Sequence, residues 1–172
     1  MKILLHTCCA PCSVYCIDKL KQMNIDMDVY WYNPNIHPYT EYKKRMDTLK
    51  QYTQMINVNA IFEDEYGLDE FCKNVISDLK NRCMNYCYRV RLEKTAQYAK
   101  QHNYDAFSTT LLISPYQNHN GVKQIAEEMA KKYDIPFFYE DFRPGFKVGQ
   151  AKARELKLYI QQYCRLHFFG KK

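Results

Sequence analysis

The feature that most constrains this chain is the cysteine-rich turn at residues 6–12, His-Thr-Cys-Cys-Ala-Pro-Cys, directly behind the run Lys2–Leu5. That run contains no Pro or Gly and predicts a short buried strand. Pro11 suits the first turn of a helix, and Val14 and Ile17 follow it at the spacing of a buried helix face. The three thiols therefore lie on a strand-to-helix turn. In an open parallel sheet this turn lies at the carboxyl end of a strand, where doubly wound folds bind their ligands.

The remaining cysteines strengthen the case for thiol chemistry. The chain has 8 cysteines, and only three apolar residues follow Lys2 at its amino terminus. Three are too few for a signal peptide or a membrane span, so we expect a cytoplasmic protein without membrane association. In a reducing compartment, clustered thiols are metal ligands or redox groups rather than structural disulfides. We assign Cys16 and Cys72 to the core as small hydrophobic residues.

Apolar periodicity predicts alternating strands and helices along the chain. The expected strands cover residues 2–5, 27–32, 58–62, 104–109 and 135–139, and the expected helices cover 10–24, 39–55, 68–79, 82–100, 121–132 and 149–163. This order predicts an α/β fold with an open, mostly parallel sheet and helices on both faces, formed by residues 1–172 as a single domain. Right-handed crossovers then bring the polar loops around residues 8, 34, 115 and 142 to one edge of the sheet.

A second pair of cysteines, Cys83 and Cys87, lies at the start of the fourth expected helix. Four residues apart on an α-helix, the two side chains face the same way, with roughly 6 Å between their β carbons. The neighbouring Arg82, Arg89 and Arg91 are expected to lower the pKa of both thiols and to hold phosphate. Two sulfurs placed in this way can share a metal site with the amino-terminal turn.

Two kinds of metal centre fit these thiols, and the residues alone leave both open. A structural zinc site needs four tetrahedral ligands. Its ligands would be Cys9, Cys12, Cys83 and Cys87. It leaves Cys8 and Cys164 unused, whereas an iron–sulfur cluster accommodates irregular spacing and leaves sulfurs for a second metal or a redox pair. With 5 glycines in the chain, neither the P-loop nor the dinucleotide fingerprint occurs.

Positive charge is concentrated at the carboxyl end of the chain. Residues 143–172 carry eight basic side chains and one acidic side chain, whereas the other residues carry 17 basic and 18 acidic side chains. A concentrated basic segment is typical of a nucleic-acid contact, and we expect Lys152, Lys157 and Arg165 to take part in it. A solvated basic helix is the alternative that charge alone leaves open.

Five blocks of the sequence carry a resemblance to a known family. They are HTCCAPCS, YNPNIHPYTEYKKR, RCMNYCYRVRLEKTA, TTLLISPYQNH and YEDFRPGFKVGQAKARELKLYIQQYC. In their order and spacing the chain resembles the QueH-type epoxyqueuosine reductases, the cobalamin-independent family. The resemblance implies a nucleotide-binding-like α/β fold of the HUP or Rossmann-like kind. It also implies an oxidoreductase that reduces the epoxide of epoxyqueuosine, at the wobble position of a tRNA, in the last step of queuosine biosynthesis.

The resemblance further implies a 4Fe–4S cluster and an adjacent single metal ion, expected to be iron. The expected ligands, at positions that match family cysteines, are Cys8, Cys9, Cys83 and Cys87, with Cys12 and Cys164 as further candidates. The family usually ends its last block with Tyr-Cys-Gly-Cys, whereas here Arg165 follows Cys164. A terminal redox pair, or one ligand, therefore lacks a cysteine in this chain.

Removal of an epoxide oxygen needs two electrons, protons and an electrophile, and a metal ion with an open position is such an electrophile. The cluster is expected to pass electrons from an external low-potential donor. Tyr116 or His119 is the expected proton donor. The expected contacts to the tRNA are Asn33, Asn35, Arg82, Tyr88, Arg89, Ser114, Asn118, Asp141 and Arg143.

Two other functions compete with this one. A cluster-dependent desulfidase of a thiolated nucleobase would use similar cysteines without the second metal. A zinc-stabilised RNA-binding module would be colourless, would hold one zinc ion and would catalyse no reaction.

Overall fold

The described part of the chain forms a sheet of four strands, all of them parallel. The computed structural model describes residues 1–161 and orders the strands β3-β2-β1-β4. Their bounds are β1 Lys2–His6, β2 Asp26–Trp31, β3 Ala60–Phe62 and β4 Ala106–Thr109. Leu5 in central β1 pairs with Val29 on one side and with Ser108 on the other. The chain moves outward from β1 to β3 and then returns to β4, so a topological switch point lies between β1 and β4.

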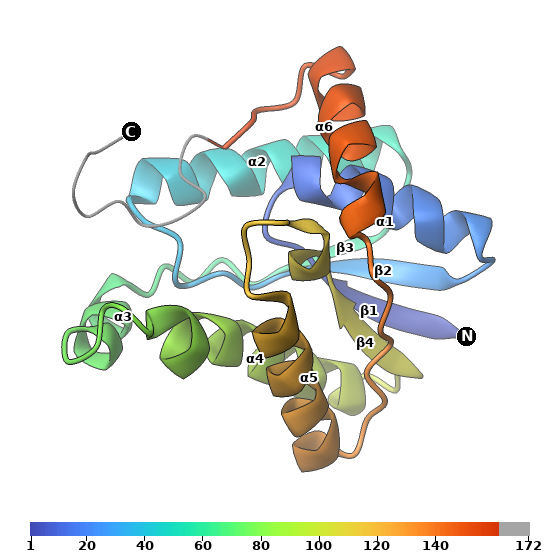
Figure 1. Cartoon of the computed structure of the whole chain (residues 1–172). Coiled ribbons are helices and arrows are strands. Elements are labelled where there is room, and N and C mark those ends of the chain that lie inside the picture. The colour runs from blue at the N-terminus through green and yellow to red at the C-terminus, as the bar shows by residue number, and fades with distance from the viewer. Residues whose placement is uncertain (162–172) are drawn as a thin grey trace.

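Helices cover both faces of this sheet (Figure 1). The α-helices are α1 Ala10–Gln22, α2 Tyr39–Met55, α3 Leu68–Val75, α4 Tyr88–Gln101, α5 His119–Tyr133 and α6 Phe146–Glu155. The short helical segments are the π-helix η1 Cys83–Cys87 and the 3-10 turns η2 Thr110–Ile113 and η3 Arg143–Gly145. In Figure 1, α1, α2 and α6 lie on one side of the sheet and α4 and α5 on the other, which confirms the predicted α/β fold. Among residues 1–161, no helix combines the length and the apolar character needed to cross a membrane.

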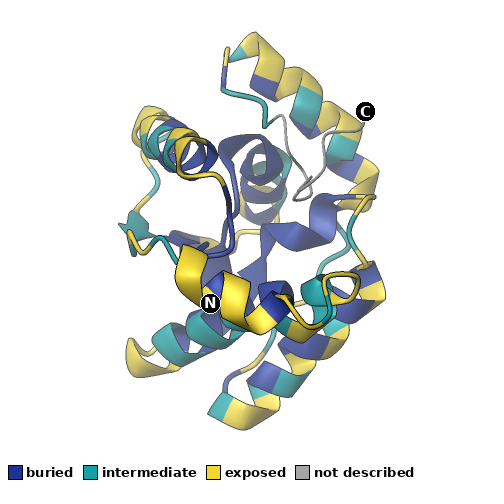
Figure 2. Ribbon diagram, turned by 90° about the vertical axis from the view of Figure 1, so that its left-hand side faces the viewer, coloured by how far each residue is buried: buried dark blue, intermediate teal, exposed yellow. Residues whose placement is uncertain are grey.

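The core lies between β1 and the helices on either face. Residues 3–5 are fully buried, as expected of a central parallel strand that is covered on both sides. Val14 and Ile17 are fully buried in α1, which confirms the inner face predicted from their spacing. Cys16 is also fully buried, so its assignment to the core is confirmed. Figure 2 shows buried residues gathered around the sheet and exposed residues on the outer sides of the helices.

The strand predicted over residues 135–139 does not form. This segment makes a single parallel bridge, between Phe107 of β4 and Phe137. The bridge consists of a bond from Phe107 N to Pro136 O at 3.0 Å and one from Phe138 N to Phe107 O at 2.8 Å. Pro136 has no N–H with which to extend a ladder. The prediction was wrong because an apolar run does not show how many residue pairs a segment makes with its neighbour.

Two predicted helices are shorter than expected. Helix α6 ends at Glu155 rather than near residue 163, because Lys157 takes the left-handed backbone conformation with φ 54°. Helix α3 ends at Val75 and buries Phe71 and Val75, four residues apart. Cys72 lies beside this buried face of α3 and is exposed, so its assignment to the core is wrong.

Gly145 allows the start of α6 to approach α1 closely. A β carbon at this position would lie 2.1 Å from Cε1 of the Tyr15 ring. We expect Gly145→Ala to lower the free energy of unfolding by about 1–3 kcal/mol, the usual cost of overpacking a core, as measured by urea unfolding. Once Tyr15→Ala has removed the ring, adding Gly145→Ala should cost little more. If Gly145→Ala lowers the free energy of unfolding as much in the Tyr15→Ala background as in the unaltered chain, this explanation is contradicted.

Candidate metal centre

Three thiols meet at the amino end of α1. The Sγ atoms of Cys8, Cys9 and Cys12 all lie within 4.8 Å of one another, and the three side chains are buried. The chain leaves β1 at His6, Cys9 is the extended N-cap of α1, and Pro11 lies in the first turn of that helix. Cys12 is three residues beyond Cys9, so its sulfur returns to the same side of the helix start. The structure therefore groups Cys12 with the two preceding cysteines.

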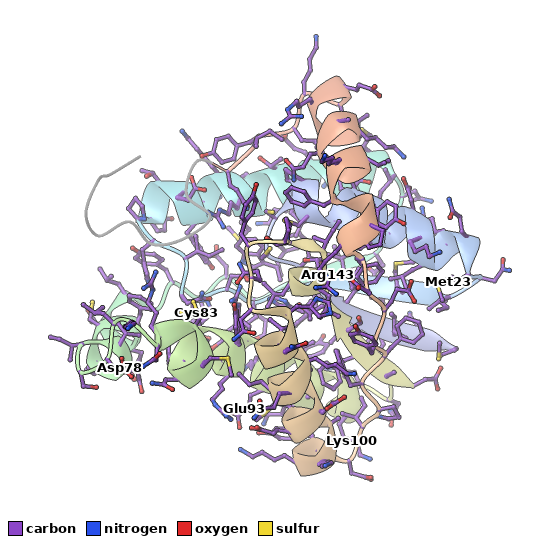
Figure 3. The ribbon with its side chains drawn as sticks, viewed as in Figure 1. Met23, Asp78, Cys83, Glu93, Lys100 and Arg143 are labelled. Carbon is purple, nitrogen blue, oxygen red and sulfur yellow. The ribbon has the colours of Figure 1, made fainter. Side chains whose placement is uncertain are left out.

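Cys83 and Cys87 face a cavity that they share with this turn. The segment η1 that carries them is a π-helix rather than the predicted α-helical turn, and it continues directly into α4. A cavity of about 80 Å³ is lined by Cys83 and Cys87 together with Cys8 and Cys12. Figure 3 shows Cys83 at the start of the helix formed by η1 and α4. Two cysteine groups that are widely separated in the sequence are thus brought to one place.

This cavity lies at the carboxyl edge of the sheet, beside the switch point between β1 and β4. Its walls come from the turn after β1, the loop after β2, the helices α2, η1 and α4, and the segment after β4. Besides the four cysteines, the lining residues are Asn35, Ile36, His37, Arg45, Arg82, Tyr88, Arg91, Thr110, Leu111, Ser114, Gln117 and Gln161. The loops around residues 8, 34 and 115 converge as predicted, whereas none of residues 140–145 lines this cavity.

The three neighbouring thiols differ in how readily they lose a proton. Hydrogen bonds from Cys12 and Cys9 hold the pKa of Cys8 well below its ordinary value, although burial acts in the opposite direction. Burial raises the pKa of Cys9, and the hydrogen bond to Cys8 raises the pKa of Cys12. Of the three thiols, Cys8 therefore loses its proton most readily. A bound cation would also favour deprotonation of Cys9 and Cys12. The donor type and the burial of these residues fit a thiolate-bound metal centre.

Two buried guanidinium groups lie on the cavity wall and add positive charge beside the sulfurs. Arg91 donates from Nε to the carbonyl oxygen of Cys87 at 2.7 Å. Arg45 donates from Nε to Oε1 of Glu41, also at 2.7 Å, and both of these side chains are buried. A centre with several thiolates carries negative charge, which buried cations offset at short range. The positive charges of Arg45 and Arg91 therefore suit a centre held by negatively charged thiolates.

The arginines do not lower the pKa of every thiol near them. Burial raises the pKa of Cys87, even though the charges of Arg91 and Arg82 act to lower it. The prediction of a lowered pKa is therefore wrong for Cys87, because desolvation of the thiolate outweighs the nearby charge. Arg89 lies outside the cavity and forms an ion pair with Glu128 at 2.8 Å.

A second cavity, of about 290 Å³, adjoins the first. Arg82, Cys83, Tyr88 and Gln117 line both cavities. The Tyr88 hydroxyl donates to Oε1 of Gln117 at 2.6 Å and accepts from the backbone N–H of Asn118 at 3.1 Å. The other residues that line the second cavity are Lys80, Asn81, Met84, Tyr116 and Asn118. The space next to the thiols is therefore bordered by basic and aromatic side chains.

Three predicted contact residues lie on the loops around the first cavity. Asn33 donates from Nδ2 to the carbonyl oxygen of Thr7 at 3.0 Å, and its Oδ1 is hydrogen-bonded to Nε2 of His6 at 3.1 Å. Asn33 thus supports the turn that carries the cysteines. Asn35 and Ser114 line the cavity itself, and Oδ1 of Asn35 is buried without a hydrogen-bond partner in the described part of the chain.

His119, Asp141 and Arg143 line neither cavity. Nε2 of His119 is hydrogen-bonded to the Tyr139 hydroxyl at 3.0 Å. Arg143 donates to both carboxylate oxygens of Asp141, from Nε at 2.9 Å and from Nη2 at 2.7 Å. Figure 3 shows Arg143 near the lower end of α6, away from Cys83. The roles assigned to these three residues in substrate binding and proton transfer stay predictions.

The pair of Asp141 and Arg143 has a measurable signature. Hydrogen bonds from Arg143 lower the pKa of Asp141 from 3.8 to about 2. The pair therefore contributes stability above pH 3.8, and this contribution is lost as the pH falls toward 2. We expect Arg143→Ala to return the pKa of Asp141 toward 3.8, as followed by carboxyl NMR titration. An unchanged pKa in the variant would contradict the observed pairing.

Arg45 and His37 are among the residues of the first cavity that were not predicted from the sequence. Glu41 and Arg45 have the spacing of an exposed helical ion pair, and nothing local indicates that both are buried. His37 lies in a loop with two prolines, and that rigid setting was the only signal for it. Cys164 and Arg165 lie outside the described residues.

The chain is similar in sequence to a family of known proteins. A family model described as "Epoxyqueuosine reductase QueH" matches residues 3–171. Relatives named "Epoxyqueuosine reductase QueH" include that of Dehalococcoides mccartyi, 38% identical over 95% of this chain and 89% of the relative, and that of Thermotoga maritima, 34% identical over 94% and 86%. A solved structure, described as a predicted subunit of tRNA methyltransferase from Methanocaldococcus jannaschii, shares the fold, with a TM-score of 0.59 and 14% identity over 90% of this chain and 74% of that one. This chain therefore belongs to the QueH epoxyqueuosine reductases, a family of oxidoreductases, as the resemblance of its five blocks predicts.

Proposed function

We propose that this protein reduces the epoxide of epoxyqueuosine in a tRNA to the cyclopentene of queuosine, using a 4Fe–4S cluster and an adjacent iron ion. The observation that carries the proposal is the meeting of Cys8, Cys12, Cys83 and Cys87 on one cavity, with Cys9 in contact with Cys8. Family membership supports the reaction, and the thiol-lined cavity supports the cofactors. The overall change consumes two electrons and two protons, and it releases the epoxide oxygen as water.

Cys8, Cys9, Cys83 and Cys87 would hold the cluster in this proposal. Cys12 then remains for the single ion, with Cys164, outside the described residues, as a further ligand. When bound, the cluster supplies electrons one at a time and the iron ion polarises the epoxide oxygen. Electrons reach the site from an external low-potential donor.

The second cavity suits the modified nucleoside and its flanking phosphates. Tyr116 is 61% exposed at its border and offers a ring for base stacking and a hydroxyl for proton delivery. Lys80 and Arg82 place positive charge on the same wall, where a phosphate of the anticodon loop can bind. The Tyr88 hydroxyl holds the side-chain amide of Gln117 in place through a 2.6 Å hydrogen bond to its Oε1. Gln117 lines both cavities.

The phosphate contact is tested by removing one charge. We expect Lys80→Ala to weaken tRNA binding and to reduce the slope of log affinity against log salt by about 1. Lys100→Ala is the matched control, because Lys100 pairs with Asp134 and lies far from Cys83 (Figure 3). Equal salt slopes for both variants would contradict a phosphate contact at the second cavity.

The basic segment at residues 143–172 stays a separate prediction for tRNA binding. Within the described part of that segment, Lys152 forms an ion pair with Asp18 at 2.5 Å. Neutralising Lys152 together with Lys157 would show whether these charges also contribute to the salt slope.

The proposed function is tested with the full chain, reconstituted with iron and sulfide without oxygen. Incubation with epoxyqueuosine tRNA and a low-potential reductant should yield queuosine, which is detected by mass spectrometry of the nucleosides. A fully loaded protein that forms no queuosine would rule out the reductase. A cluster without a second metal and activity on a thiolated base would favour the desulfidase, and a colourless protein with one zinc ion would favour the RNA-binding module.

A further inference from the structure

His37 is a buried histidine whose ring has no hydrogen-bond partner within residues 1–161. The side chain is 7% exposed, and neither Nδ1 nor Nε2 has a partner among the described residues. No other side chain in residues 1–161 leaves two buried polar atoms unpaired. A buried polar atom without a partner is destabilising, so such atoms usually mark the position of a bound water or ion.

The imidazole is held in place on the wall of the first cavity. Its ring packs against Tyr66 at a centroid distance of 5.1 Å and against Phe71 at 4.6 Å. Phe71 also packs in an apolar cluster with Cys87, which places His37 on the side of the cavity formed by η1. Burial lowers the pKa of His37 to about 4, so the ring is neutral at pH 7. A neutral imidazole is a common ligand for iron.

Few of the side chains that line the first cavity could be ligands of a single iron ion. Among residues 1–161, no Asp or Glu lines this cavity, and His37 is the only imidazole that does. The Tyr88 hydroxyl also lines it but is already hydrogen-bonded to Gln117 and to the backbone of Asn118. If Cys8, Cys9, Cys83 and Cys87 hold the cluster, Cys12 and His37 are the strong donors that remain within the described residues.

We propose that the imidazole of His37 is a nitrogen ligand of the single metal ion beside the cluster, a proposal that rests on the function proposed above. The position of His37 favours an ion over the substrate as the partner of this ring. His37 lines the first cavity, together with Cys8, Cys12, Cys83 and Cys87, and does not line the second one. The nucleoside therefore approaches from the second cavity, and His37 faces the metal side.

The test uses the full chain with its cluster assembled and kept in the oxidised, diamagnetic state. A chelator removes the single iron ion, and Co²⁺ is then added as a paramagnetic probe. Pulsed EPR should detect the hyperfine coupling of a coordinated imidazole nitrogen, and ¹⁵N-histidine labelling should change that coupling. This measurement on the unaltered chain needs no variant.

Substitution then assigns the nitrogen to a residue. His37→Ala should abolish the coupling and weaken Co²⁺ binding by at least about 10-fold, the lower end of the loss for even an outer-shell partner, while the cluster absorption is kept. His102→Ala is the matched control, because this exposed histidine stacks on Tyr98 in the α4 region, outside both cavities.

Each outcome decides the proposal. A nitrogen coupling that is lost in His37→Ala and kept in His102→Ala supports it. Co²⁺ bound without an imidazole coupling, or with a coupling that survives His37→Ala, overturns it while the proposed function stands. A chain that assembles no cluster overturns the proposed metal centre itself, and the His37 assignment with it.

Discussion

We expect the replacement of Cys83 by serine to abolish the proposed iron–sulfur cluster and to lower epoxyqueuosine reduction by more than about 100-fold, since loss of even an outer-shell partner costs 10–100-fold. Serine keeps the size of the side chain but replaces a thiolate donor by a hydroxyl, which stays protonated near neutral pH. Cys83 lines both cavities and is only partly buried, so the substitution leaves no large void in the core. The loss is measured as iron and sulfide per chain, as cluster absorption and as queuosine formed.

Cys72→Ser is the matched control for this experiment. Cys72 is an exposed cysteine on α3 and lines neither cavity. It tests whether removing any thiol impairs reconstitution. Full iron and sulfide content in Cys83→Ser would show that this residue is not a ligand. Cys12→Ser extends the test, because it should spare the cluster and reduce binding of the single ion.

The second large effect is expected at the buried ion pair of Glu41 and Arg45 on α2. Both side chains are buried, at 2.7 Å from Nε to Oε1, and Oε2 of Glu41 accepts from the Tyr159 hydroxyl at 2.5 Å. Arg45→Met leaves a buried carboxylate without its cation. The free energy of unfolding should fall by about 3–5 kcal/mol, the usual result of breaking a buried pair on one side.

Removing both charges should recover much of this loss. In Glu41→Leu/Arg45→Met no unpaired charge is left in the core. The free energy of unfolding should then stay about 1 kcal/mol below that of the unaltered chain, because the Tyr159 hydroxyl loses Glu41 as its acceptor. Lys43→Met is the matched control, because Lys43 and Asp47 form an exposed pair with the same spacing on the same helix and should contribute at most about 1 kcal/mol. Urea unfolding measures all of these variants. A loss in Arg45→Met no larger than in Lys43→Met would contradict the ion-pair explanation.

The sequence by itself determined the features that depend on short-range physics. The run Lys2–Leu5 is the central strand, and α2 spans Tyr39–Met55 as its periodicity predicted. Pro11 and the spacing of Val14 and Ile17 define the start and inner face of α1. These features follow from side-chain shape and apolar period, which act over a few residues. The cysteine groups and the family were readable for a similar reason, because their motifs are contiguous.

Only the tertiary structure decided which side chains meet. His37, Arg45 and Cys12 come from three different elements, and the order β3-β2-β1-β4 brings them to one cavity. Tertiary contacts also explain the predictions that were wrong. Cys72 faces solvent because of what α3 packs against, and residues 135–139 form one bridge, at Phe107 of β4, because Pro136 has no N–H to extend the ladder. Burial and pairing are properties of contacts between distant segments, so a local pattern of residues cannot contain them.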